Sequence, residues 1–238
     1  MRWNVSARFA LVIAALLLGI FSAACFVGNC NRILIKQTAQ ATSTHITIDT
    51  QSVKFPYSVE GTPLIAERLI SYEGTFLEDG GESEVVGVAA LMLKNQGKDH
   101  IRSAQIRVLQ GERILTFELT HLPPGKEILV LEKNKQLFYG DNISACVGVA
   151  EVIRDNGWMN KTQITPTGRR SLQIMNLTNE KLENVIVHYK TFYAPAGFYV
   201  GGITYSICIE KVKELEAVQL FPYPFEEQSS AVVWVSLE

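Results

Sequence analysis

The strongest constraint on the fold of this chain is an internal repeat of alternating apolar residues. The apolar positions of segment 91–108 match those of segment 172–189 at an offset of 81 positions, without a gap. A second match, at an offset of 90 positions, joins segments 122–130 and 212–220. Alternation with period two is the pattern of β-strands that have one buried face. A duplicated β-unit accounts for the repeat; chance similarity between alternating strands is the other interpretation.

The chain after residue 40 continues in the same pattern. Short runs of β-branched and aromatic residues are separated by turn sequences at intervals of about 8–12 residues, and no long amphipathic helix is visible in the sequence. Such spacing is typical of a sandwich of two β-sheets. We therefore predict an all-β fold with two tandem Ig-like β-sandwich domains, residues 45–135 and residues 136–238. Segment 64–71 fits either a helical turn or a strand.

The N-terminal segment predicts a membrane anchor. Residues 9–28 form a run of twenty residues without a charge, which as a helix is long enough to cross a hydrocarbon core of about 30 Å. Arg2 and Arg8 precede this run, and basic residues favour the cytoplasmic side of a membrane. We expect a cytoplasmic tail over 1–8, a single transmembrane helix, a stalk over 29–44, and a body outside the cytoplasm.

Two other interpretations of the same segment stay open. Ser22, Ala23 and Ala24 fit the small-residue pattern of a signal-peptide cleavage site, so the segment could be removed after secretion. Cys25, which follows the two alanines, could instead carry the lipid of a lipoprotein. Both interpretations also place the body outside the cytoplasm.

The distribution of charge argues against one class of partner. The first 40 residues carry four basic and no acidic side chains, whereas the remaining residues carry 18 basic and 24 acidic ones. Proteins that bind nucleic acid need a basic face for the phosphates, and this acidic body has no basic stripe in its sequence. We predict no nucleic-acid partner; the expected partners are the membrane, through residues 9–28, and an envelope protein or glycan.

The sequence contains no motif that predicts an enzyme or a cofactor. Gly81 stands two positions before Ser83, but the second glycine of the G-x-S-x-G nucleophile elbow is missing. The four histidines, His45, His100, His121 and His188, lie far apart, and strand alternation predicts that His188 faces solvent. We therefore predict no catalytic activity, no cofactor and no metal site, while a metal site assembled by histidines across strands stays open.

The cysteines allow one disulfide within a predicted domain. Cys25 and Cys30 lie in or beside the predicted membrane segment, whereas Cys146 and Cys208 fall in the same predicted domain. In an oxidising compartment Cys146 and Cys208 could form a disulfide. Two unpaired, half-buried thiols are the alternative, and no C-x-x-C motif or zinc-like spacing is present.

A long hairpin in the second repeat is the candidate partner-binding site. It is nine residues longer than its counterpart in the first repeat, which is the difference between the two offsets, and it carries Tyr193, Phe198 and Tyr199. Extra loop residues on a rigid β-scaffold commonly bind partners, and exposed apolar residues mark interaction sites. The alternative is that these aromatic side chains fold back onto the core of the second domain.

Two stretches of the chain resemble known cell-surface modules. A strand ends in N-x-G at Asn95 and in N-x-T at Asn176, and the first repeat continues to an L-P-P-G turn before its next strand. This pattern resembles bacterial cell-surface Ig-like repeats, namely the adhesion-related CARDB type over 88–130 and the FxLYD type over 170–221. In the second stretch V-x-Y-K-T-F-Y stands in place of the usual strand ending in Leu-Tyr-Asp. The resemblance implies an extracytoplasmic, non-catalytic module.

These observations together predict a single-pass protein of the cell membrane whose body is an extracytoplasmic binding or structural module. Two alternatives come from other functional classes. A carbohydrate-binding envelope module would expose two or more aromatic rings in one plane. An envelope hydrolase would need a nucleophile and a base within hydrogen-bond reach in an open cleft.

Overall fold

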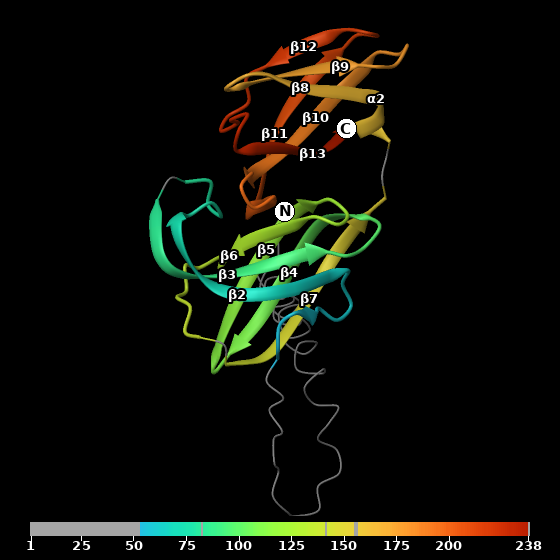
Figure 1. The fold of residues 1–238 in the computed structure, drawn as a ribbon. Coiled ribbons are helices and arrows are strands. Elements are labelled where there is room, and N and C mark those ends of the chain that lie inside the picture. The colour runs from blue at the N-terminus through green and yellow to red at the C-terminus, as the bar shows by residue number, and fades with distance from the viewer. Residues whose placement is uncertain (1–52, 82, 141, 155–156, 238) are drawn as a thin grey trace, which may run out of the picture. The chain divides into compact units, whose positions relative to one another are not determined.

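Strands make up most of the described chain (Figure 1). The structure is a computed structural model that describes residues 53–237, except for 82, 141 and 155–156. The predicted tail, transmembrane helix and stalk therefore lie outside the described residues. Within the described part, no helix is long and apolar enough to cross a membrane. All of the described strands belong to one compact unit.

The strands fall into two sets along the chain. The first set consists of β1 (Tyr57–Ser58), β2 (Leu64–Thr75), β3 (Glu84–Asn95), β4 (His100–Gln110), β5 (Arg113–Leu122), β6 (Glu127–Leu131) and β7 (Ile143–Ile153). After one helical turn, α2 (Trp158–Lys161), the second set consists of β8 (Thr162–Gly168), β9 (Ser171–Asn176), β10 (Leu182–Tyr193), β11 (Phe198–Val212), β12 (Ala217–Leu220) and β13 (Ser230–Leu237). The segment left open by the sequence is a strand, β2, because it pairs along its whole length with β3.

Both sets pair their strands in the same order. In the first set β3 lies between β2 and β6, and β4 lies between β5 and β7; in the second set β9 lies between β8 and β12, and β10 lies between β11 and β13. Leu91 pairs with Val130 in the first set, and Leu172 pairs with Leu220 in the second. These partners keep both offsets of the sequence repeat, so the repeat in sequence is also a repeat in structure.

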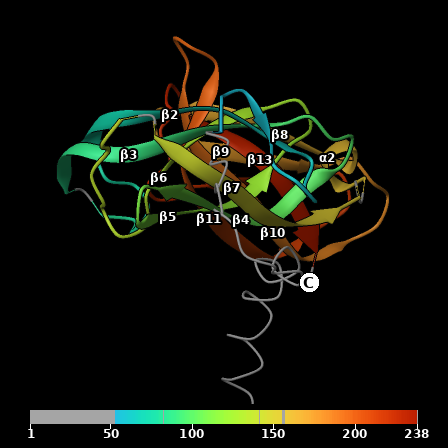
Figure 2. The same ribbon diagram turned by 90° about the horizontal axis from the view of Figure 1, so that it is seen from below.

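Each set has its own apolar core between its sheets. In the first set Leu91 and Leu93 of β3 belong to the same buried cluster as Ile106 of β4. In the second set Ile174 of β9 and Val187 of β10 share a separate cluster. Figure 2 shows β2, β3 and β6 on one side of the first core and β4 and β5 on the other. The prediction of an all-β fold is confirmed, and the sheets are consistent with a β-sandwich.

A buried asparagine fixes the same turn in both sets. The side-chain Nδ2 of Asn95 donates to the carbonyl oxygen of Asp99 at 3.0 Å, and that of Asn176 donates to the carbonyl oxygen of Glu180 at 2.7 Å. Each Nδ2 also donates to the carbonyl oxygen of the last residue of a strand, Leu122 of β5 and Val212 of β11. Because both asparagines are fully buried, these bonds satisfy backbone groups that would otherwise lack partners.

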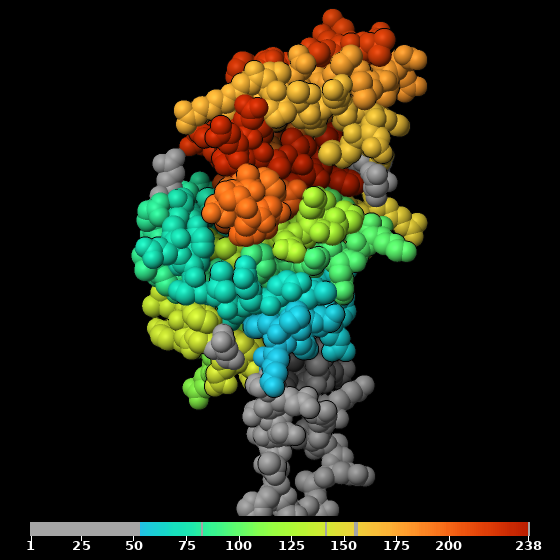
Figure 3. All heavy atoms as spheres, viewed as in Figure 1, coloured from blue at the N-terminus to red at the C-terminus, as the bar shows by residue number. Residues whose placement is uncertain are grey.

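The two sets share one sheet. The start of β11 pairs in parallel with β6, where Tyr199 is opposite Ile128, so that β1, β2, β3, β6, β11, β10 and β13 form one seven-stranded sheet. The orange residues in Figure 3 mark this part of the chain against the strands of the first set. Strand β7 follows the predicted boundary at 135/136 but pairs with β4. By pairing, the chain leaves the first set at Ile153 and enters the second at Thr162; the domain boundary stays a prediction.

Candidate functional site

Three histidines from three strands meet at one place. His100 opens β4, His121 lies near the end of β5, and His188 lies in β10. His100 Nε2 and His121 Nδ1 are 3.2 Å apart, within hydrogen-bonding distance. The rings of His121 and His188 stack with their centroids 4.3 Å apart, and the ring of Trp234 lies 4.4 Å from that of His100. His188, which the sequence predicts to face solvent, is half-buried, and one face of its ring stacks on His121.

A local irregularity of the sheet places His121 in this group. Ile101 pairs with Leu122 and Ser103 pairs with Thr120 in one register, but Arg102 and His121 between them do not form a pair. On its other edge, β4 shifts register against β7 between Ile101 and Ser103. His121 adopts a φ of 47°, in the left-handed region that non-glycine residues rarely occupy. Strained backbone of this kind is held by the surrounding structure and often lies at functional sites.

These side chains line an open cleft of about 400 Å³, called the histidine cleft below. Its lining residues are Arg102, His121, Ile153, Arg154, His188, Trp234, Ser236 and Leu237. His188 Nε2 lies 3.2 Å from Ser236 Oγ. At the rim Arg102 forms an exposed ion pair with Glu151 at 3.2 Å. The lining of this cleft therefore includes two arginines, two histidines and one serine.

The surroundings keep the His121 imidazole neutral at physiological pH. Burial, together with charge repulsion from the nearby His188, His100, Lys190 and Arg102, lowers the pKa of His121 to about 3. A protonated imidazole at this position would lose its hydration and would also lie close to other positive charges. Within the described residues, no group of three or more His, Cys, Asp or Glu side chains is arranged to hold a metal ion. The three histidines thus form a ring cluster rather than a set of metal ligands.

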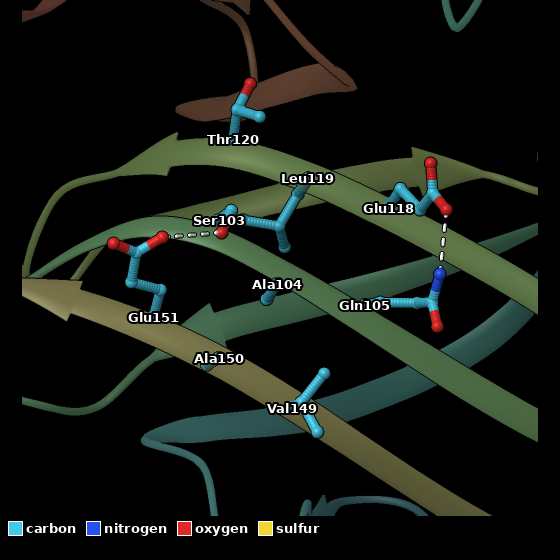
Figure 4. A pocket seen from close by; sticks show the side chains of 9 residues that line it. All are labelled: Ser103, Ala104, Gln105, Glu118, Leu119, Thr120, Val149, Ala150 and Glu151. Carbon is cyan, nitrogen blue, oxygen red and sulfur yellow. Dashed lines mark hydrogen bonds between the residues drawn. The ribbon is translucent and has the colours of Figure 1, made fainter. Parts of the chain in front are cut away.

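A second hollow, of about 440 Å³, lies on the face of the sheet β5-β4-β7 (Figure 4). Around it Gln105 Nε2 donates to Glu118 Oε1 at 2.8 Å, and Ser103 Oγ donates to Glu151 Oε2 at 3.4 Å. Its polar side chains are thus bonded to one another, and Figure 4 shows these pairs on opposite sides of small apolar side chains. The histidine cleft is the better candidate because two arginines, two histidines and one serine line the same space.

The three aromatic residues predicted to bind a partner differ in exposure. Tyr193 is 50% exposed, whereas Tyr199 is only 5% exposed and belongs to the core of the first set. Phe198 is half-buried and packs against a third apolar cluster built on β3 and β6. The hairpin therefore folds onto the first set rather than onto the core of the second domain. A partner-binding role for the hairpin stays a prediction, and Tyr193 is the residue that a partner could reach.

The predicted disulfide between Cys146 and Cys208 is not formed in the structure. Both cysteines are free; Cys146 is buried and Cys208 is exposed. Cys146 lies in β7 and contributes to the core of the first set, while Cys208 lies in β11 of the second. Burial raises the pKa of the Cys146 thiol to about 11, so this thiol is unreactive at neutral pH.

A buried lysine forms a polar joint between the two sets, and no pattern in the sequence predicts it. The register of β10 against β11 jumps opposite Lys190, leaving 201–204 as a bulge. Lys190 Nζ donates to the carbonyl oxygens of Gly202 and Ile203 at 2.7 and 2.6 Å. In the same bulge, the N–H of Gly202 donates to both carboxylate oxygens of Glu78 at 2.9 and 2.8 Å.

Comparison with known proteins gives no family for this chain. No protein-family model matches it, and no curated protein matches it in sequence. The resemblance to CARDB-type and FxLYD-type repeats therefore stays a prediction. The histidine cleft was also missed by sequence reasoning, because its two histidines, His121 and His188, lie 67 positions apart and no motif joins them.

Proposed function

We propose that the protein is a membrane-anchored, extracytoplasmic binding module without catalytic activity, built from two tandem Ig-like β-sandwich domains. Residues 9–28 would hold it in the membrane, and the histidine cleft would be its binding site. The single-pass anchor is supported by the uncharged N-terminal run. The domain type is supported by the two sets of strands with the same pairing order.

The histidine cleft carries the proposal. Arg102 and His121 come from β4 and β5 of the first set, while His188 and Trp234 come from β10 and β13 of the second. These four side chains sit on paired strands, so this part of the cleft is preorganised by the scaffold, while Arg154 follows the end of β7. A rigid, donor-rich hollow with an aromatic wall is typical of a small-ligand site.

Enzymatic hydrolysis is the alternative, because Ser236 and His188 lie within hydrogen-bond distance in this open cleft. A serine nucleophile needs a base, and the base is commonly oriented by a carboxylate. Among the described residues that line the cleft there is no Asp or Glu, and the ring stacked on His188 belongs to another histidine. Binding is therefore the better supported function.

A carbohydrate-binding role has weaker support from two other aromatic residues. Phe221 and Tyr223 are both highly exposed, at 75% and 76%, and lie two positions apart after β12. Exposed rings can stack on sugar faces. Loss of glycan binding in a Phe221→Ala, Tyr223→Ala double variant that keeps its melting temperature would favour this role over the histidine cleft.

Two experiments test the main proposal. In alkaline carbonate extraction the full chain should stay with the membrane fraction, and release of the intact, uncleaved chain into the supernatant would contradict the anchor.

In parallel, the purified chain is treated with a fluorophosphonate probe that labels activated serines. We expect no labelling; labelling that disappears in Ser236→Ala but persists in the nearby control Ser206→Ala would establish the hydrolase alternative instead.

A further inference from the structure

We infer that the histidine cleft binds an oxyanion group, of the sulfate, phosphate or carboxylate type, and takes up a proton as the anion binds. The inference rests on the proposed binding role and names the class of ligand. It concerns the cleft alone, so it does not depend on whether residues 9–28 form a membrane anchor. Three features of the cleft support it: the charge of the lining, the state of the imidazoles, and the bond within the histidine cluster.

The lining of the cleft carries positive charge and hydrogen-bond donors. Arg102 and Arg154 both line it, and the Ser236 hydroxyl adds a neutral donor. Among the described residues, Arg102 pairs with Glu151 at the rim, while Arg154 has no ion pair. Guanidinium groups hold carboxylate and phosphate oxygens with two parallel bonds. Trp234 forms part of the wall, and its low exposure reduces the water that would compete with these bonds.

The protonation of the imidazoles in the cleft depends on the charge of the ligand that occupies it. The groups around His121 are His100 and Arg102 on β4, Glu151 on β7, Arg154 after it, and His188 and Lys190 on β10; burial and the positive neighbours dominate its ionisation. A bound anion reverses the sign of this field, so it favours the imidazolium form that the empty cleft disfavours. By linkage, a proton that strengthens anion binding is also held more tightly by the anion complex.

The hydrogen bond within the cluster limits the number of protons taken up. His100 Nε2 and His121 Nδ1 are 3.2 Å apart, and such a bond needs a proton on one nitrogen and a lone pair on the other. The pair can therefore carry one positive charge, but not two, while the bond is kept. We accordingly expect this pair to take up at most one proton for each anion bound.

The test is calorimetric titration of the full chain in detergent with sodium sulfate, from about pH 4.5 to about pH 7, in two buffers of different ionisation enthalpy. Sulfate keeps its charge over this range, so a pH dependence comes from the protein. We expect saturable binding whose affinity rises by up to about tenfold for each pH unit lowered, with net proton uptake. Affinity that does not change with pH, or no saturable binding at all, would overturn the inference.

Three variants separate the site from general effects of salt. Arg154→Gln removes an exposed charge from the cleft and should weaken sulfate binding at least about tenfold, whereas Arg107→Gln removes an exposed charge from β4 outside the cleft and should leave it unchanged. His121→Asn keeps a residue that tolerates a positive φ and should reduce the pH dependence. Equal binding by the Arg154 and Arg107 variants would contradict the site.

A second anion distinguishes the two geometries of ligand. Trifluoroacetate carries a planar carboxylate that also keeps its charge over this range. Tighter binding of sulfate indicates a tetrahedral group such as a sulfate or phosphate ester, and tighter binding of trifluoroacetate indicates a carboxylate ligand; both support the oxyanion site. Failure of both anions overturns the inference but leaves the proposed binding module to be tested by its membrane extraction and its lack of serine labelling.

Discussion

At the scale of single residues, Lys190 is the most unusual side chain of the described protein. It is fully buried, and its ammonium group reaches the carbonyl oxygens of the bulge in β11. Burial lowers the pKa of Lys190 to about 7, while the nearby Glu78 opposes this change. A lysine whose pKa is much lower in the folded state than in the unfolded state makes the stability of the fold depend on pH.

The sign of this dependence follows from the two pKa values of Lys190. Between its folded value of about 7 and its ordinary value of 10.5, the unfolded chain holds the proton that the folded chain has released. The free energy of unfolding should therefore rise with pH, by up to about 1.4 kcal/mol per pH unit for one proton. Urea unfolding at about pH 7 and about pH 8, below the ordinary pKa values of cysteine and tyrosine side chains, measures the change.

The matched variants are Lys190→Met and Lys211→Met. Lys190→Met should unfold at lower urea at both pH values, because the carbonyl groups of the bulge lose their donor, and its stability should no longer rise over this range. Lys211 is an exposed lysine of β11. In Lys211→Met, the free energy of unfolding should still rise with pH. If the rise survives in Lys190→Met, another group causes it.

At the scale of elements, the repeated turn depends on its buried asparagine. Asn95 and Asn176 each bond through both the Nδ2 and the Oδ1 atoms to backbone groups. Asn95→Ala and Asn176→Ala should each lower the free energy of unfolding by about 2–3 kcal/mol, because buried backbone groups lose their partners. Chemical denaturation measures this, with Asn160→Ala in exposed α2 as the control, expected within about 0.5 kcal/mol of wild type. A small effect at only one of the two sites would mean that the turns are not equivalent.

The long hairpin also behaves as part of the packed structure. Tyr199 is buried in the core of the first set, and burial raises its pKa; Tyr193 is exposed and contacts Phe198, with ring centroids 5.5 Å apart. Tyr199→Ala should cost about 3 kcal/mol or more of stability, whereas Tyr193→Ala should cost about 1 kcal/mol or less. Thermal melting compares the two. A partner bound by the hairpin should be lost in the Tyr193 variant without a change in melting temperature.

At the scale of the whole molecule, the described strands should unfold together. The two sets share a sheet through β6 and β11, and Thr120 Oγ1 lies 2.8 Å from Thr204 Oγ1 across the same region. The carboxylate of Glu78 accepts the N–H groups of both Leu131 and Gly202, so one side chain ties the first set to the second. Differential scanning calorimetry of the full chain should therefore show one transition from the described strands.

Removing the Glu78 carboxylate should make the unfolding of the two sets less cooperative. Glu78→Ala leaves two backbone N–H groups without their acceptor, at a cost of about 1–3 kcal/mol, which lowers the melting temperature by several degrees and broadens or splits the transition. Glu73→Ala, which removes an exposed carboxylate from β2, is the control and should melt like wild type. Two well-separated transitions in the unaltered chain would show instead that the two sets fold independently, as the predicted domain boundary implies.

The local features of the fold could be predicted from the sequence. Strand alternation, the repeat at offsets of 81 and 90 positions, and the equivalent asparagines all have their physical cause within a few neighbouring residues, since burial of one face sets the period. Segment 64–71 could not be assigned, because its pattern also fits a helical turn and only pairing with β3 settles it.

Tertiary structure alone decided which distant residues meet. The histidine cluster joins strands whose residues lie far apart in the chain, and the stacking of His188 on His121 brings together residues of the second and the first set. Lys190 is buried because a bulge of β11 folds over it, and Tyr199 enters the core because β11 pairs with β6. The sequence by itself determined the strands and their repetition, since these follow from local periodicity; the cleft and the joint follow from long-range packing, which no local pattern encodes.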